Sequence, residues 1–195
     1  MGTHHKGAGS WQHDYTTRLR VIDEEFVHEF ARAASRVLGT RPTKVWLDKK
    51  TGLWQTDVNS MLLYRFLNKP FGELKTFIEH CKECTAAFIR GFFDAEAGVG
   101  TRSFSIAVGN RELIIYVQNL LKEYFLIDST GPYQRGPPPG TTKVIKGSVV
   151  RVNMYTYAIR INAKSLKAFQ GMIGFTLLRK KDALRNLVES RGRRK

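Results

Sequence analysis

The segment from residue 84 to 97, CTAAFIRGFFDAEA, decides the fold, because it predicts a helix with two unusual features. Small residues recur on one face of it, at Ala87, Gly91 and Ala95. This spacing by four would let another helix approach closely, although an alanine-rich helix can show it by chance. Asp94 and Glu96 fall in the last turn, at the negative end of the helix dipole, where a carboxylate costs about 0.3–1 kcal/mol. A cation such as Mg²⁺ would offset that cost; two solvated surface acids are the alternative.

The chain before this helix predicts a strand, a helix, a hairpin and short helical stretches. Residues 15–21 alternate in polarity, which is typical of a half-buried strand with a basic outer face. A helix follows from Asp23 to Gly39, with acids in its first turn and a glycine at its end. The segments TKVWL and LWQTDV form a hairpin around DKKTG. Short helices are expected at residues 60–68 and 71–82.

After Gly98 the same order of elements begins again. TRSFSIAVG is a strand, Asn110 caps a helix, and GPYQRGPPPGTTK at residues 131–143 is expected to be a loop. Residues 144–161 hold one or two strands. A short helix lies at 163–174, and a terminal helix begins at residue 178.

Two pairs of equivalent positions define an internal repeat. Asp23 and Asn110 stand 87 positions apart, and Asn59 and Asn162 stand 103 apart. The 16 additional residues fit the Gly- and Pro-rich insertion of the second half. The repeat predicts an α+β fold of two half-domains related by a pseudo-twofold axis. We expect a flexible start at 1–13, half-domains at 14–80 and 81–190, and a basic tail at 191–195.

Composition points to a polyanionic partner. The 195 residues are 42% apolar, which is a globular value, and their 32 basic against 17 acidic residues give a net charge of +15. Nucleic acid is the first candidate and an anionic membrane the second. We expect no membrane partner, because no run approaches the roughly 18 apolar residues of a membrane span. No secretory signal is visible, so an intracellular, cytoplasmic protein is expected.

The residues at 89–97, IRGFFDAEA, resemble the LAGLIDADG motif of the homing endonucleases. The segments HCKECTAAFIRGFFDAE, NRELIIYVQNLL and IGFTLLRKKDAL are similar to the archaeal intron- or intein-encoded members, and the resemblance runs from about Thr17 to Val188. It implies two pseudo-symmetric αββαββα half-domains with saddle-shaped antiparallel sheets. It also implies a site-specific, nucleoid-associated endonuclease that uses Mg²⁺ or another divalent cation to hydrolyse double-stranded DNA at a long asymmetric or pseudo-palindromic site.

The resemblance assigns roles to a few residues. Glu96 occupies the position of the metal-binding, catalytic acid. Asp94 occupies a position where an acid more often supports the turn than binds metal. Ala97 replaces the closing glycine of the motif. Lys180, or its neighbour Lys181, falls where some members place a lysine that stabilises charge on the phosphate.

The repeat places a first motif helix near or before Met1, and no such helix is visible in the sequence. Three explanations are open. The true start may lie upstream; helix 84–97 could pair with that of a second copy in a homodimer; or the protein is a degenerate member that binds DNA or acts as an intron RNA maturase.

Basic and polar residues on the predicted strands and turns are candidate DNA contacts. The strand candidates are Arg18, Arg20, Lys44, Trp46, Trp54, Gln55, Arg102, Ser103, Ser105, Arg151, Asn153 and Tyr155. The expected phosphate contacts are Lys49, Lys50, Arg135, Lys143, Lys146 and the tail 191–195. Cys81 and Cys84 form a single CxxC after His80; packed thiols are expected, with a redox pair or a metal site as alternatives.

Overall fold

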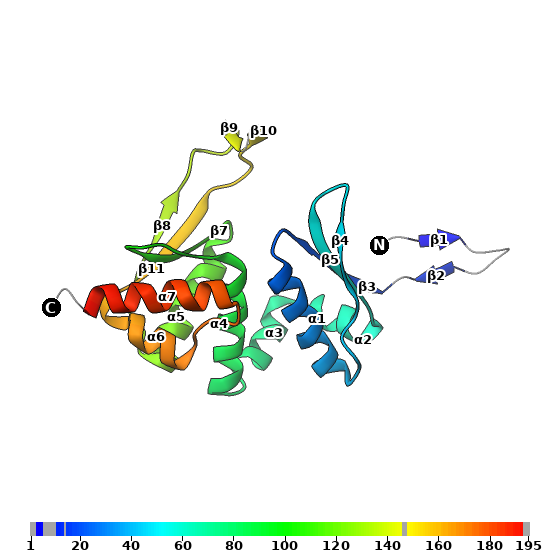
Figure 1. The fold of residues 1–195 in the computed structure, drawn as a ribbon, viewed down its shortest axis with the longest axis horizontal. Coiled ribbons are helices and arrows are strands. Elements are labelled where there is room, and N and C mark those ends of the chain that lie inside the picture. Colours follow the sequence, from blue (N-terminus) through cyan, green and yellow to red (C-terminus); the bar gives the residue numbers. More distant parts are fainter. Residues whose placement is uncertain (1–2, 6–10, 14, 146–147, 193–195) are drawn as a thin grey trace. The chain divides into compact units, whose positions relative to one another are not determined.

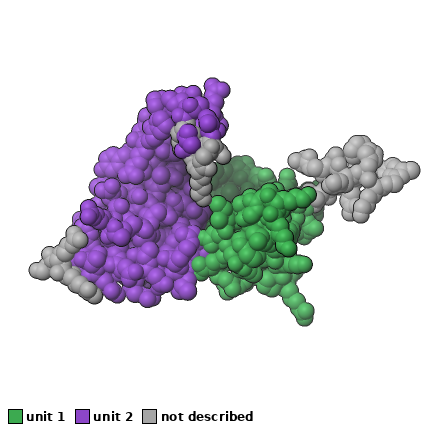
Figure 2. Space-filling model, turned by 45° about the horizontal axis from the view of Figure 1, so that its top comes forward, with its two compact units in different colours: residues 1–76 green, residues 77–195 purple. Residues whose placement is uncertain are grey.

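A computed structural model describes residues 3–5, 11–13, 15–145 and 148–192. The chain forms two compact units, residues 1–76 and 77–195 (Figure 2). The predicted boundary at residue 80 lies four positions further on, because the end of α3 (Phe71–Ile78) already belongs to the second unit. Ile78 packs against the core of that unit, and its carbonyl accepts a hydrogen bond of 2.9 Å from the Thr85 hydroxyl.

The first unit is built on a three-stranded antiparallel sheet in the order β3-β5-β4, against which α1 packs (Figure 1). Its elements are β1 (Thr3–His5), β2 (Trp11–His13), β3 (Thr16–Val21), α1 (Glu24–Leu38), β4 (Val45–Asp48), β5 (Leu53–Asn59), α2 (Met61–Leu67) and α3. Val27, Ala31 and Ala34 of α1 are buried, so the apolar stripe of this helix faces the sheet. The predicted flexible start contains β1 and β2, which pair with each other.

The second unit packs its helices against a four-stranded antiparallel sheet in the order β6-β7-β11-β8. Its elements are α4 (Lys82–Glu96), β6 (Ala97–Val99), β7 (Phe104–Val108), α5 (Arg111–Phe125), β8 (Ser129–Arg135), β9 (Thr142–Ile145), β10 (Ser148–Arg151), β11 (Thr156–Ile161), η1 (Ala163–Ser165), α6 (Leu166–Met172) and α7 (Leu178–Gly192). Phe93, Phe104, Phe169 and Phe175 form its aromatic centre, with ring centroids 4.8 to 5.8 Å apart. Among the described helices, none combines the length and hydropathy that a bilayer crossing requires.

The internal repeat is confirmed by the two sheets. In both units a strand leads into a long helix, a hairpin follows, and its second strand lies in the middle of the three: β3-β5-β4 matches β7-β11-β8. Asp23 and Asn110 cap α1 and α5 by accepting hydrogen bonds of 3.3 and 3.0 Å from a backbone N–H three residues on. Both helices have 15 residues, and both end in the left-handed conformation, at Gly39 and at Leu126.

The additional residues of the second repeat form a ribbon. β9 and β10 pair with each other between β8 and β11, and Figure 1 shows them at the end of two long arms. The predicted loop over 131–143 is therefore wrong at both ends, since β8 extends to Arg135 and β9 begins at Thr142. Pro132 is tolerated in β8 because that strand is an edge of the sheet, where a missing N–H donor costs no ladder bond.

In the first unit, no helix of the described ranges precedes β3, whereas α4 precedes β6 and β7 in the second. The absence of a first motif helix stays a prediction.

Candidate metal site and nucleic-acid interface

Glu96 is the last residue of α4, and its side chain is exposed. In the part of the chain that the structure describes, its carboxylate has no hydrogen-bond or ion-pair partner. It stands at the negative end of the α4 dipole, which favours a cation there. One carboxylate with water and a phosphate oxygen is a typical ligand set for Mg²⁺, so this residue fits the predicted metal.

Asp94, one turn position earlier, has a structural role instead. It is buried, and its carboxylate accepts hydrogen bonds from the backbone N–H groups of Thr176 at 3.0 Å and Leu177 at 3.3 Å. These residues lead into α7, whose positive N-terminal end favours a carboxylate. The alternative of Asp94 as a metal ligand is therefore corrected, because its oxygen atoms are already engaged.

Lys180 completes this junction from the other side. Its side chain is buried, and its Nζ donates to the carbonyls of Asp94 at 2.6 Å and Phe93 at 3.1 Å. These are carbonyls of the last turn of α4, which lack helix partners and carry the negative end of the dipole. The predicted catalytic lysine is thus placed as a cap that joins α7 to α4, and the cation that offsets the acids of α4 is partly this lysine.

Lys181 points elsewhere and is exposed. Together with Arg90 of α4 and Arg185 of α7 it lines a cavity of about 470 Å³. Arg90 is held there by a hydrogen bond of 2.7 Å from its Nε to the carbonyl of Ile173. Sequence reasoning missed Arg90, which stands inside the motif but off its small-residue face.

The small-residue face of α4 is open. Ala87, Gly91 and Ala95 are exposed, and a Cβ added at Gly91 would meet no atom within 4 Å. Phe88 and Phe92 flank this face as a stacked pair with centroids 6.0 Å apart. The face is available to a second helix, and its role as a helix-pair interface stays a prediction.

In the first unit, the strand candidates gather on one face of the sheet. Trp46 pairs with Gln55, and Gln55 pairs with Arg20, so these three side chains form a row across β4, β5 and β3. Arg18 pairs with Asp57 on the same face. Trp54 lies on the opposite face, because neighbouring residues of a strand alternate, and its inclusion is corrected.

Two arginines of this face are engaged by acids of their own sheet, which the sequence did not indicate. Arg18 donates to Asp57 through two bonds of 2.6 and 2.5 Å, and Arg20 donates to Asp48 at 3.1 Å. The pKa of Asp48 is lowered, first by a hydrogen bond from the Thr51 hydroxyl and also by the charge of Arg20. Lys44 and the turn residues Lys49 and Lys50 are exposed on the same hairpin.

In the second unit, register pairs place Ser105, Arg160 and Thr130 in a row on the outward face of β7, β11 and β8. The neighbouring residues Ile106, Ile159 and Ile161 are buried on the other face. Arg160 was missed, although its place between two buried isoleucines in the alternating β11 marks it as outward.

The remaining candidates lie on the loops and the ribbon of this unit. Ser103 is half-buried just before β7, and the Arg102 carbonyl accepts a hydrogen bond of 2.6 Å from Arg191. Arg135, Arg151 and Asn153 are exposed, and Tyr155 is half-buried where the ribbon joins β11. The side chains of Lys143 and Lys146, and residues 193–195 of the predicted tail, lie outside the described residues.

Comparison with known proteins places this arrangement in a family. Residues 83–174 match the family model of a LAGLIDADG-like domain. The uncharacterized protein MJ0398 of Methanocaldococcus jannaschii is 28% identical over 179 residues, which cover 90% of this chain and 64% of that protein. The chain thus spans slightly less than two thirds of the length of this curated relative.

Solved structures of I-DmoI share the fold. The structure of I-DmoI in complex with DNA and Ca has a TM-score of 0.61 at 15% identity, covering 94% of this chain and 88% of that chain. Mesophilic variants of the homing endonuclease I-DmoI reach 0.59 at 17% identity, again over 94% and 88%. With the family's domain in its second unit and the I-DmoI fold along most of its length, the chain belongs to the LAGLIDADG family.

Proposed function

We propose that the protein is a site-specific DNA endonuclease that hydrolyses phosphodiester bonds with a divalent metal held at Glu96. The observation that carries this proposal is the exposed, unpartnered Glu96 carboxylate at the end of a rigidly held motif helix. Asp94 and Lys180 beside it are both occupied by the α4–α7 junction, which leaves Glu96 as the group that is free to bind.

The metal, Mg²⁺ by its preference for hard oxygen ligands, would supply an activated water and charge stabilisation at the leaving oxygen. Glu96 binds and orients the cation. Asp94 and Lys180 act as positioning residues, since they fix the end of α4 from which Glu96 projects. I-DmoI structures contain DNA together with Mn, Mg or Ca, which supports a divalent cation in a protein of this fold.

The outward sheet faces are proposed to contact the DNA. Arg160, Ser105 and Thr130 in the second unit, and Arg20, Gln55 and Trp46 in the first, offer side chains that can read base edges. Phosphate contacts from the exposed lysines and arginines would make the affinity fall steeply with salt. A binding constant that is flat between low and physiological salt would contradict this proposal.

The test begins by selecting duplexes from a randomised DNA library that bind the wild-type protein. These duplexes are then incubated with Mg²⁺ and the wild type, Glu96→Gln or Glu83→Gln, an exposed acid at the other end of α4. We expect the wild type and Glu83→Gln to cut, and Glu96→Gln to bind without cutting. Cutting by Glu96→Gln would refute the role of Glu96. Binding without cutting by the wild type would favour the nucleic-acid-binding or RNA maturase function.

We further propose that two copies pair through Ala87, Gly91 and Ala95, so that each supplies one Glu96. Light scattering at micromolar concentration should show a dimer, and Gly91→Leu should abolish it by blocking close approach of the helices. A wild type that scatters as a monomer would overturn this assembly.

A further inference from the structure

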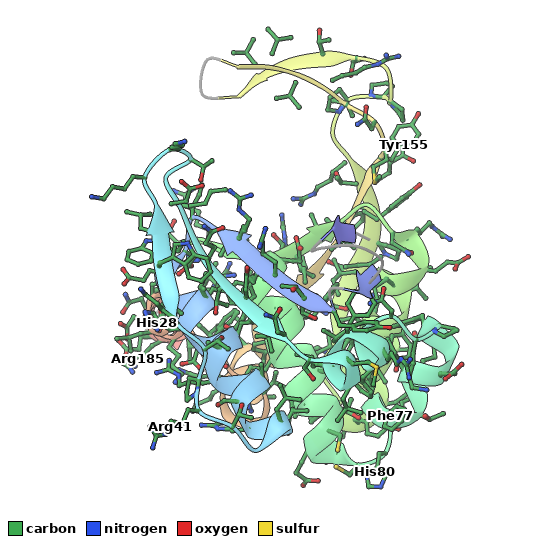
Figure 3. The ribbon with its side chains drawn as sticks, turned by 90° about the vertical axis from the view of Figure 1, so that its right-hand side faces the viewer. His28, Arg41, Phe77, His80, Tyr155 and Arg185 are labelled. Carbon is green, nitrogen blue, oxygen red and sulfur yellow. The ribbon has the colours of Figure 1, made fainter. Side chains whose placement is uncertain are left out.

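The two cysteines lie at the start of α4, at the opposite end of the helix from Glu96. Cys81 is the N-cap of α4, and its Sγ accepts a hydrogen bond of 3.1 Å from the N–H of Cys84. Donor atoms of His80, Cys81 and Cys84 all lie within 4.8 Å of one another. Both thiols are half-buried and His80 is exposed. Figure 3 shows His80 at the end of the second unit far from Tyr155 at the base of the ribbon.

The spacing of the sulfur atoms separates two chemistries. The Sγ atoms of Cys81 and Cys84 are 2.6 Å apart. Two thiolates on one tetrahedral zinc, each bonded at about 2.3 Å, stand roughly 3.7 Å apart. A disulfide requires about 2.05 Å. The observed separation is therefore nearer to that of a disulfide, and the pair would have to spread by about 1 Å to hold zinc between its sulfur atoms.

We propose that Cys81 and Cys84 form a redox-active dithiol that exchanges with low-molecular-weight disulfides. The Cys81 thiolate attacks the small disulfide, forms a mixed disulfide and releases one small thiolate. The Cys84 thiolate then attacks the Cys81 sulfur, closes the Cys81–Cys84 bond and releases the second. The protein loses two electrons and two protons, and the small disulfide becomes two thiols.

The surroundings assign the order of attack. The helix N-terminus and the N–H of Cys84 stabilise negative charge on the Cys81 sulfur, as at other reactive thiols. The pKa of Cys84 is raised, first by its hydrogen bond with Cys81 and then by burial, so Cys84 keeps its proton until the second step. His80 Nδ1 lies 4.0 Å from the Cys84 Sγ and is placed to accept that proton.

Mass spectrometry of the full-length chain after incubation with glutathione disulfide tests the proposal. We expect the wild type to lose the mass of two hydrogens without keeping an adduct. Cys84→Ser should stop at a single glutathione adduct on Cys81, and Cys81→Ser should never close. His80→Gln should slow closure near neutral pH and approach the wild type at alkaline pH.

Two results would overturn the proposal. One is a wild type that stays reduced or accumulates the glutathione adduct while its circular dichroism is that of a folded protein. The other is zinc bound at one equivalent by the reduced wild type and lost in both serine variants, which would make the cluster a metal site. Neither readout involves DNA, so failure here leaves the proposed endonuclease untouched.

Discussion

The two units share one topology, but their sheets carry opposite electrostatic solutions. In the first unit the outward arginines, Arg18 and Arg20, are paired with Asp57 and Asp48 of the same sheet. In the second, Arg160 lies outward and has no acidic partner among the described residues. A repeated fold therefore does not imply a repeated surface.

The interiors differ as well. The core of the first unit is a small aliphatic cluster around Ala34, Val58 and Leu63. The second unit has a far larger core that includes the aromatic centre. We infer that the second unit is the more stable platform, and the following changes test how far this difference extends.

The largest expected effect comes from the two cores. Phe169 is fully buried among three other phenylalanines, and Phe169→Ala should lower the free energy of unfolding of its unit by about 3–5 kcal/mol. Leu63→Ala in the first unit should cost nearer 2 kcal/mol. All three tryptophans lie in residues 1–76, so tryptophan fluorescence during urea unfolding follows the first unit, and circular dichroism follows both. A fluorescence transition displaced equally by both variants would show that the units unfold as one.

The next effect concerns the α4–α7 junction, which has no counterpart in the described part of the first unit. Asp94→Ala leaves two backbone N–H groups of the loop before α7 without their acceptor, and we expect a loss of about 3 kcal/mol. Lys180→Met should cost about 2 kcal/mol. The exposed neighbour supplies the matched control, because Lys181→Met should change stability by less than about 0.5 kcal/mol. Equal effects at both lysines would refute the capping role of Lys180.

A smaller effect compares the ends of α1 and α5. Both end in the left-handed conformation, with φ of 63° at Gly39 and 56° at Leu126. Leucine is strained there, and its side chain is 76% exposed, so little packing is lost without it. Leu126→Gly should stabilise the second unit by about 0.5–1 kcal/mol, and Gly39→Ala should destabilise the first by about 1 kcal/mol. Leu126→Ala, which keeps the Cβ, serves as the control and should gain little.

The smallest expected effect is a pH dependence confined to the second unit. Hydrogen bonds from Lys122 and Lys164 lower the pKa of Asp128 from 3.8 to about 2. Because the folded-state pKa is the lower one, these pairs stabilise the protein above pH 4, and the contribution disappears as the pH falls toward 2. Asp128→Asn should flatten the acid limb of stability followed by circular dichroism. Lys164→Met should give an intermediate slope; a slope equal to that of the wild type would exclude the role of Lys164.

Local signals in the sequence predicted much of the fold. Asp23 and Asn110 cap their helices as expected, since an N-cap depends on a side chain and the next few backbone groups. The repeat followed from positions that keep their spacing in the chain. Pro132 misled the prediction of β8, because being at a sheet edge is a property of the tertiary fold.

The candidate site was less predictable, because burial and partners are not local. Lys180 and Lys181 are equivalent in sequence, yet one caps α4 and the other faces a cavity. The acids that engage Arg18 and Arg20 come from other strands, 39 and 28 residues away. Strand alternation alone identifies two faces without saying which is covered, which explains the error at Trp54.

The junction between α4 and α7 also sets an order of events during synthesis. The partners of Asp94 lie 82 and 83 residues downstream, so the ribosome must add those residues before the carboxylate finds its N–H groups. At roughly 5–20 residues per second this takes on the order of 4–17 seconds. Until then the end of α4 that presents Glu96 is unfinished. The nascent chain should therefore acquire a shaped metal-binding end only near completion, so that translation itself delays when the protein becomes competent.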